Sequence, residues 1–167
     1  MIKFDFENKN AIVTGASMRL GKAIAKAKAN GAIADLNEEE ALKTKAKLEV
    51  YGTKIITYTM AVSSYEAFEG LVDKTSKELG SIDILVNNAG IFVTEPLVDV
   101  NVNTINKMIK VNINGTVYGC KAVLPVMQKQ QAGCIINMSS IAAKLSGAGA
   151  AVYSLTIASV LERTACL

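Results

Sequence analysis

Short apolar segments alternate with amphipathic ones along the chain, and this alternation sets the expected fold. The first apolar run, residues 10–14 (NAIVT), ends at Gly15 and predicts a buried strand. Residues 22–30 are rich in Ala and Lys and predict a helix that stops at Gly31. Further strands are predicted from their apolar and β-branched residues at 32–35, 54–60, 82–87 and 134–139.

Polar capping residues indicate where two of the intervening helices begin. Asn37 with Glu40 three positions later has the capping-box spacing, and Ser63 with Glu66 repeats it. A long helical region is predicted from about residue 101 to 130. Behind Ser63, helical spacing gives one inward apolar face, made of Phe68, Leu71, Val72, Thr75 and Leu79.

Strands that alternate with helices at this rhythm predict an α/β fold. The expected architecture is a Rossmann-type doubly wound parallel sheet with helices on both faces. No internal repeat, low-complexity tract or Pro/Gly-rich linker interrupts residues 1–167, so a single domain is expected. Ligands of such sheets bind beyond the carboxyl ends of the strands, where the strand order reverses. Functional residues are therefore expected at those ends.

Composition narrows the functions that the chain can have. Half of the residues are hydrophobic, 20% are charged and the net charge is only +3, a globular balance. The lysines are scattered among acidic residues, which predicts no nucleic-acid partner. Residues 145–161 are uncharged, but their Gly, Ser and Thr content predicts no membrane role. The first ten residues lack the apolar region of a secretory signal, so a cytoplasmic location is expected.

Histidine is absent, and the three cysteines Cys120, Cys134 and Cys166 form no C-x-x-C pair. The absence of histidine excludes Ser-His-Asp and Cys-His nucleophile systems and every His-ligated metal site. The cysteine spacing predicts reduced thiols, with neither a disulfide framework nor a metal site. Any acid/base chemistry must come from Tyr, Lys, Asp, Glu or Cys side chains.

The turn after the first strand has the glycine spacing of a phosphate-binding loop. Gly15 permits the tight turn, Gly21 permits close helix–strand packing, and the helix N-terminus offers N–H groups to a pyrophosphate. An ordinary strand–helix turn also accounts for two such glycines. Asp35 adds a carboxylate at the end of the second strand, where it can accept both adenosine ribose hydroxyls and repel a 2′-phosphate. This favours NAD over NADP; a surface or helix-cap carboxylate is the alternative for Asp35.

Five motifs then resemble one family in their order and approximate spacing. They are V-T-G-A-S-x-x-x-G at 13–21, N-N-A-G at 87–90, V-N at 111–112, I-N-M-S-S at 136–140 and Y-S at 153–154. The chain resembles the short-chain dehydrogenases/reductases from about residue 5 to 163. The resemblance implies a dinucleotide-binding domain over 1–167 and an NAD(P)-dependent oxidoreductase. It also implies a small alcohol or ketone substrate and a homo-oligomer, dimeric or tetrameric.

The resemblance assigns roles to individual residues. Tyr153 corresponds to the family's general acid/base, and Ser140 to the serine that hydrogen-bonds the carbonyl oxygen and orients it for hydride attack. Asn112 corresponds to the helix asparagine that binds a water in the proton relay. The cofactor-binding positions that the resemblance implies are Gly15, Ser17, Arg19, Leu20, Gly21, Asp35, Asn88, Ala89 and Gly90.

Position 157 departs from the family pattern, which has Lys four residues after the Tyr. Ile157 stands there instead. A tyrosine has an ordinary pKa of about 10, which a neighbouring ammonium lowers and an apolar neighbour raises. Ile157 also cannot make the hydrogen bond that the family's Lys makes to the nicotinamide ribose. These losses favour an alternative function, a non-catalytic dinucleotide-binding or scaffold protein, unless Lys144 substitutes.

Other departures accumulate. Arg19 occupies the middle glycine position of the loop, and Ala61 stands where family members commonly have an Asp that contacts adenine. Only 14 residues separate Gly21 from Asp35, whereas about 20 are expected in this fingerprint. The family also continues beyond the position of Leu167 with elements that close the substrate pocket. A third hypothesis is therefore a partial or imperfect sequence that lacks the C-terminal part of the fold.

Overall fold

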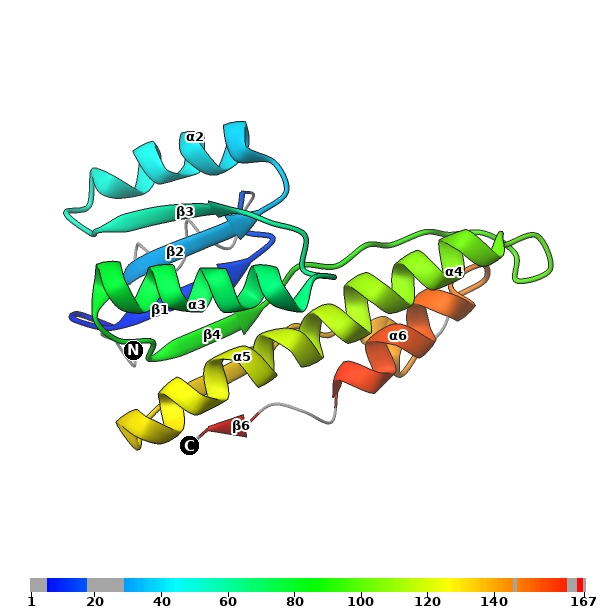
Figure 1. The fold of residues 1–167 in the computed structure, drawn as a ribbon. Helices are drawn as coiled ribbons and strands as arrows, with labels where there is room; N and C mark the ends of the chain where they lie inside the picture. Colours follow the sequence, from blue (N-terminus) through cyan, green and yellow to red (C-terminus); the bar gives the residue numbers. More distant parts are fainter. Residues whose placement is uncertain (1–5, 18–28, 146, 162–164, 167) are drawn as a thin grey trace, which may run out of the picture.

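Six strands form one sheet in the computed structural model, which describes residues 6–17, 29–145, 147–161 and 165–166 (Figure 1). The strands are β1 (Asn10–Thr14), β2 (Asn30–Asp35), β3 (Ile55–Thr59), β4 (Ile84–Asn87), β5 (Cys134–Asn137) and β6 (Ala165–Cys166). They are ordered β3-β2-β1-β4-β5-β6, and the first five of that order run parallel. The order reverses between β1 and β4, so a ligand site is expected beyond the carboxyl ends of these two strands.

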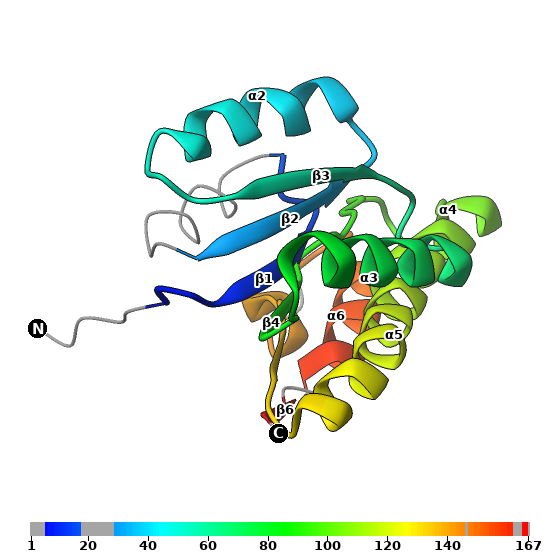
Figure 2. The same ribbon diagram turned by 60° about the vertical axis from the view of Figure 1, so that its left-hand side comes forward.

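Helices lie on both faces of this sheet (Figures 1 and 2). The helical elements are α2 (Glu38–Glu49), α3 (Tyr65–Leu79), α4 (Val102–Met108), the π-helical turn η1 (Ile109–Asn114), α5 (Gly115–Gln130), the short 3-10 turn η2 (Ile141–Ala143) and α6 (Ala151–Leu161). α2 covers one face, and α3 and α5 cover the other. The doubly wound parallel sheet that the sequence predicts is therefore confirmed.

Two apolar layers hold the helices against the sheet. In the larger layer, Phe68 of α3 and Val123 of α5 are fully buried against Ile12 and Leu85 of the central strands. In the smaller layer, Leu48 of α2 is buried against the opposite face, where it meets a second set of strand residues. Each such side chain contributes about 1.5–3 kcal/mol relative to an exposed one. The strand residues of the smaller layer are Val13, Ile33, Ile55 and Val86.

The second strand is longer than the sequence predicts. β2 begins at Asn30, not at residue 32, so the expectation of a helix up to residue 30 is wrong at its end. The backbone N–H of Asn30 donates to Lys9 O at 2.9 Å, and its side-chain amide donates to Asn10 Oδ1 at 3.1 Å. These bonds place Asn30 in the sheet, one residue before Gly31. The rest of the predicted helix, and the cofactor positions Arg19, Leu20 and Gly21, lie outside the described residues.

The predicted cap of α2 is confirmed. Asn37 is the N-cap, and its Oδ1 accepts the backbone N–H of Glu40 at 3.1 Å. The reciprocal half of the capping box is replaced, because the Glu40 carboxylate pairs with Lys43 at 2.8 Å and the Asn37 N–H donates to Asp35. Asp35 therefore fixes the start of α2 as well as the end of β2.

The N-cap of α3 lies one residue later than predicted. Ser64, not Ser63, is the N-cap, and its hydroxyl oxygen accepts the N–H of Ala67 at 3.1 Å. The Ser64 hydroxyl donates to the carboxylate of Glu66. Two adjacent serines offer the same capping chemistry, so the sequence pattern alone could not choose between them. The inward face is confirmed, with Phe68, Leu71, Val72 and Thr75 buried and Leu79 partly buried.

The outer edge of β5 carries a strand that the sequence did not predict. β6 pairs with β5 in the antiparallel sense, Cys134 opposite Cys166 and Ile135 opposite Ala165. This pairing satisfies backbone groups that an edge strand would otherwise leave open. Cys120 and Cys134 are both partly buried. Over the described residues, no helix is long and apolar enough to cross a membrane, and no cluster of metal-ligating side chains occurs.

The turn after β1 comes into close contact with the segment after β4. Gly15 has φ +63°, a left-handed conformation, and a Cβ added there would lie 2.8 Å from the Cα of Ala89. A backbone atom at that distance cannot swing away as a side chain can. Glycine is therefore required at position 15 for its conformation and for the space it leaves.

A pair of glycine substitutions separates these two requirements. Gly52 also has a left-handed conformation, φ +78°, but no atom lies within 4 Å of its would-be Cβ. We expect Gly52→Ala to lower the free energy of unfolding by about 1–2 kcal/mol through backbone strain alone. Gly15→Ala should cost about 1–3 kcal/mol more, because the added methyl also displaces Ala89. Urea denaturation of both variants measures the difference, and equal losses would contradict the close contact.

Candidate active site

A cavity of about 520 Å³ opens at the carboxyl ends of β1, β2 and β4. It lies at the point where the strand order reverses, as expected for the ligand site of a doubly wound sheet. Six of the nine predicted cofactor positions lie in the described part of the chain, and all six line this cavity. They are Gly15, Ser17, Asp35, Asn88, Ala89 and Gly90.

The carboxylate of Asp35 is held at the rim of this cavity by two backbone groups. Ser17 N donates to Asp35 Oδ2 at 3.0 Å, and Asn37 N donates to Asp35 Oδ1 at 3.0 Å. Each oxygen of a carboxylate can accept more than one hydrogen bond, so both remain able to accept ligand hydroxyls. Asp35 thus orders the β1 turn while it presents negative charge to the cavity.

Asn88 and Thr14 hold the segment after β4 against the turn after β1. The Asn88 side-chain amide donates to Thr14 O and to Gly15 O, both at 3.0 Å. The hydroxyl oxygen of Thr14 accepts the backbone N–H groups of Asn88 and Ala89, both at 3.1 Å. Thr14 is only 1% exposed, so these bonds are shielded from water. The floor of the cavity is therefore rigidly connected to two strands.

Two lysines that the sequence analysis missed also line the cavity. Lys107 and Lys110 project from α4 and η1, and both are exposed. A pair three residues apart lies on one face of a helix, and it immediately precedes the V-N motif. That spacing could have indicated them, but it took the fold to bring this helix face over the cavity. Among the described residues, the cavity carries one carboxylate and two ammonium groups.

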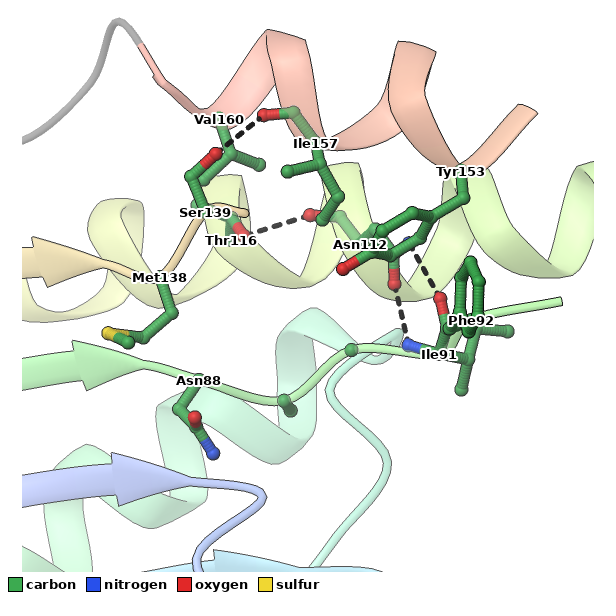
Figure 3. Close-up of a pocket in the computed structure, with 12 residues that line it drawn as sticks. Asn88, Ile91, Phe92, Asn112, Thr116, Met138, Ser139, Tyr153, Ile157 and Val160 are labelled. Atoms are coloured by element: carbon green, nitrogen blue, oxygen red, sulfur yellow. Dashed lines mark hydrogen bonds between the residues drawn. The ribbon is translucent and has the colours of Figure 1, made fainter. Parts of the chain in front are cut away.

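A second, smaller cavity of about 230 Å³ adjoins the first (Figure 3). The two share one segment, residues 88–91, which forms part of both linings. Tyr153 and Asn112, predicted as catalytic, both line the smaller cavity. Apolar residues that the sequence analysis did not name complete much of its wall, namely Ile91, Phe92, Met138 and Val160.

The Tyr153 side chain projects from α6 into this cavity. Its ring meets the ring of Phe92 edge-on, with centroids 4.6 Å apart and an interplanar angle of 69°. Figure 3 shows the two rings in contact beside Asn112. The Tyr153 side chain is half-buried, and its hydroxyl forms no hydrogen bond with the described residues. It is available to a ligand.

Asn112 is buried at the centre of the π-helical turn η1, with 2% of its surface exposed. Its Oδ1 accepts Ile91 N at 2.8 Å, and its Nδ2 donates to Ile91 O at 3.0 Å and to Thr156 Oγ1 at 2.9 Å. Its backbone carbonyl accepts the Thr116 hydroxyl at 2.9 Å. The side chain thus binds protein groups: both of its N–H bonds donate, and its Oδ1 accepts one hydrogen bond.

The two serines after β5 have different positions. Ser139 lines the small cavity and donates its hydroxyl to Ile157 O at 3.2 Å. Ser140, predicted as catalytic, is not among the lining residues; its Oγ accepts Ala142 N at 3.3 Å and caps the short turn η2. A hydroxyl that accepts a backbone N–H still has its own proton to donate. Ser140 therefore keeps a donor that can act on a ligand.

Ile157 lines the small cavity one helical turn after Tyr153, with 6% of its surface exposed. The apolar side chain occupies the place where the family pattern has an ammonium group. Lys144 does not replace it, because Lys144 is exposed at the end of η2 and does not line the cavity. Within the part of the chain that the structure describes, the lining of the small cavity therefore contains no cation.

A doubly wound α/β fold with paired cavities at the strand-order reversal is the architecture of dinucleotide-dependent enzymes. The family model described as short chain dehydrogenase matches residues 9–167. Relatives include 3beta-hydroxysteroid dehydrogenase 2 of Eggerthella lenta, 34% identical over 93% of this chain. Diacetyl reductase [(S)-acetoin forming] of Staphylococcus epidermidis is 35% identical over 94% of this chain. The chain belongs to the short chain dehydrogenase family.

Solved structures agree with this assignment. NAD+-bound xylitol dehydrogenase has a TM-score of 0.89 and 30% identity over 94% of this chain. A short-chain type dehydrogenase/reductase from Mycobacterium marinum has a TM-score of 0.91 and 27% identity over 96% of it. The chain spans 62% of the length of the hydroxysteroid dehydrogenase and 63% of the diacetyl reductase.

Proposed function

We propose that this chain provides the cofactor-binding and catalytic residues of an NAD-dependent oxidoreductase. The reaction is hydride transfer between the nicotinamide cofactor and a small carbonyl compound or secondary alcohol. One observation carries the proposal: the cavity lined by the cofactor positions and the cavity lined by Tyr153 share residues 88–91. A dinucleotide that spans both would bring its reactive end beside the Tyr153 hydroxyl.

The residues of the larger cavity fit the adenosine half of the cofactor. Asp35 accepts the ribose hydroxyls, and Gly15 gives the tight turn that a phosphate-binding loop needs after β1. When bound, NAD supplies or accepts the hydride. The smaller cavity fits the nicotinamide ribose less well, because Ile157 offers no hydrogen bond there.

In the catalytic step, Tyr153 gives its phenolic proton to the carbonyl oxygen as the hydride arrives at the carbonyl carbon. Ser140 donates a hydrogen bond to the same oxygen and so orients the carbonyl. The backbone carbonyl of Asn112 can hold a water from which the proton is replaced. In alcohol oxidation the same groups act in reverse.

Ile157 supports a second candidate function, a non-catalytic dinucleotide-binding or scaffold protein. Without an ammonium group, neither the phenolate of Tyr153 nor a ribose near it gains the charge-assisted hydrogen bond that a Lys would give. The adenosine-side cavity does not depend on position 157, which does not line it. Nucleotide binding would then persist without turnover.

The wider expectations follow the family. Relatives named for diacetyl reduction, cyclopentanol dehydrogenation and sorbitol dehydrogenation favour a small alcohol or ketone as substrate. A single dinucleotide-binding domain over 1–167, a homo-oligomer and a cytoplasmic location are part of the same proposal.

Asp35 is expected to set the preference for NAD over NADP. Asp35→Ser removes the acceptor for the ribose hydroxyls and should weaken NAD+ binding about tenfold, the effect of one lost charge-assisted hydrogen bond. NADP+ should bind more tightly than before, because its phosphate no longer meets a carboxylate. Calorimetric titration with both cofactors measures the shift. Glu38→Ser is the control: it removes the same charge at the exposed start of α2, outside the cavity, and should leave the preference unchanged.

Position 157 is expected to determine whether the second ribose contributes to binding. ADP-ribose carries that ribose and ADP does not, so the ratio of their dissociation constants isolates its contribution. In the natural chain we expect a ratio close to one. Ile157→Lys should favour ADP-ribose about tenfold, since a hydrogen bond to a charged group contributes about 1.5–3 kcal/mol. Ile157→Met, which is apolar and of similar length, should leave the ratio unchanged; a gain in that variant would show a packing effect instead.

Turnover separates the two candidate functions. With NADH and diacetyl as the probe substrate, Ile157→Lys should increase the rate of cofactor oxidation over that of the natural chain. Adding Tyr153→Phe should then lower the rate by about 100-fold or more, the usual contribution of general acid catalysis. Turnover that survives Tyr153→Phe contradicts the acid/base role. No turnover in Ile157→Lys, together with saturable ADP-ribose binding, favours the non-catalytic function.

A further inference from the structure

A buried hydroxyl connects the helix that carries Tyr153 to the rest of the small cavity. Thr156 lies on α6 with 2% of its surface exposed. Its hydroxyl donates to Tyr153 O at 2.8 Å and accepts Asn112 Nδ2 at 2.9 Å. None of the sequence motifs assigns this residue a role, and it does not line either cavity.

The direction of these bonds fixes how the Asn112 amide is oriented. A threonine hydroxyl has one proton, and Thr156 gives it to the Tyr153 carbonyl. Its lone pair then requires a donor from Asn112, which must turn its NH₂ group toward Thr156. The Asn112 Oδ1 is left facing Ile91 N, which it accepts at 2.8 Å. The two-point contact with the backbone of Ile91 depends on this orientation.

The residue after Ile91 contacts the ring of Tyr153. Phe92 is the next residue, and its ring meets the Tyr153 ring edge-on at 4.6 Å. The contacts therefore form a closed loop that begins and ends at Tyr153. It leads from the Tyr153 backbone carbonyl to Thr156, and from there to Asn112 and Ile91. Phe92, the next residue, closes the loop because its ring contacts the Tyr153 ring. Phe92 is 60% exposed, so little else packs against it to fix its position.

We propose that Thr156 is a positioning residue, whose hydroxyl sets the orientation of the Tyr153 ring through Asn112, Ile91 and Phe92. The catalytic meaning of this orientation rests on the proposed function, but the orientation itself does not. Replacing the hydroxyl with a methyl group leaves one N–H of Asn112 without an acceptor in a buried place. The Ile91 backbone still orients the amide, but the link through Asn112 that joins the Ile91–Phe92 segment to α6 is lost.

Fluorine NMR of the chain labelled with 3-fluorotyrosine tests this inference without any turnover. The chain has five tyrosines, and the signal of Tyr153 is the one lost in Tyr153→Phe. Phe92→Leu removes the neighbouring ring and gives the shift expected when the contact is lost. Thr156→Val should move the Tyr153 signal in the same direction, and Thr156→Ser, which keeps the hydroxyl, should return it to its original position.

A second buried threonine provides the matched control. Thr75 of α3 is 0% exposed and donates its hydroxyl to Leu71 O at 2.7 Å, away from both cavities. Thr75→Val should lower stability as any lost buried hydrogen bond does, yet leave the Tyr153 signal in place. If Thr156→Val does not fold, Thr156→Ala removes the same hydroxyl without adding a methyl group against Asn112.

The outcomes distinguish this inference from the proposed function. An unmoved Tyr153 signal in folded Thr156→Val or Thr156→Ala overturns the positioning role, whatever Tyr153 does in turnover. The same shift in Thr75→Val shows general loosening and also overturns it. If the signal moves as expected but turnover survives Tyr153→Phe, the positioning role stands and the acid/base assignment fails.

Discussion

The close contact between the turn after β1 and the segment after β4 is the constraint on which both cavities depend. It requires a residue without a Cβ at Gly15, because the Cα of Ala89 occupies that space. It also requires Asn88 and Thr14, which exchange four hydrogen bonds between the two segments. Parallel strands in a twisted sheet diverge at their ends, so side-chain bonds of this kind must hold their loops together.

The segment that makes this contact also connects the larger cavity to the small one. Residues 88–91 line both cavities, and Ile91 is held by Asn112 from the helical layer above the sheet. A ligand that shifts this segment in the larger cavity therefore acts on the Tyr153 cavity as well. The π-helical turn contributes here, because its wider winding places the Asn112 side chain beside Ile91 while its carbonyl meets Thr116. Such turns recur at functional sites for this reason.

Local signals predicted the fold well. The strand at 10–14 and the Asn37 cap follow from a few adjacent residues, and both occur as expected. The two predictions that were wrong, the cap of α3 and the start of β2, depend on tertiary structure. Ser63 and Ser64 are equivalent in sequence, and only the path from β3 decides which one caps α3 and which one lines the cavity. The early start of β2 depends on Asn30 meeting Asn10, a contact across 20 positions of the chain.

The same distinction applies to the candidate site: local motifs predict some of its residues, and tertiary packing determines the others. Most described motif residues reach the expected cavities, although Ser140 does not line either one. Lys107, Lys110 and Phe92 line the cavities, and Thr156 contacts Asn112 beside one of them, through packing that no short pattern encodes. Ser139 and Ser140 show the limit most clearly: both follow β5, yet Ser139 lines the small cavity while Ser140 caps the turn η2.

Buried and exposed residues of the site provide different kinds of evidence about function. Asn112, Thr156 and Thr14 are buried, Asn88 is partly buried, and all four satisfy each other's or the backbone's hydrogen-bonding groups, so losing any of them would cost stability. Folding alone therefore accounts for their presence. The Tyr153 hydroxyl has no such task, because it faces the cavity without a partner among the described residues. An apolar ring would pack against Phe92 equally well, so packing among the described residues does not account for the hydroxyl.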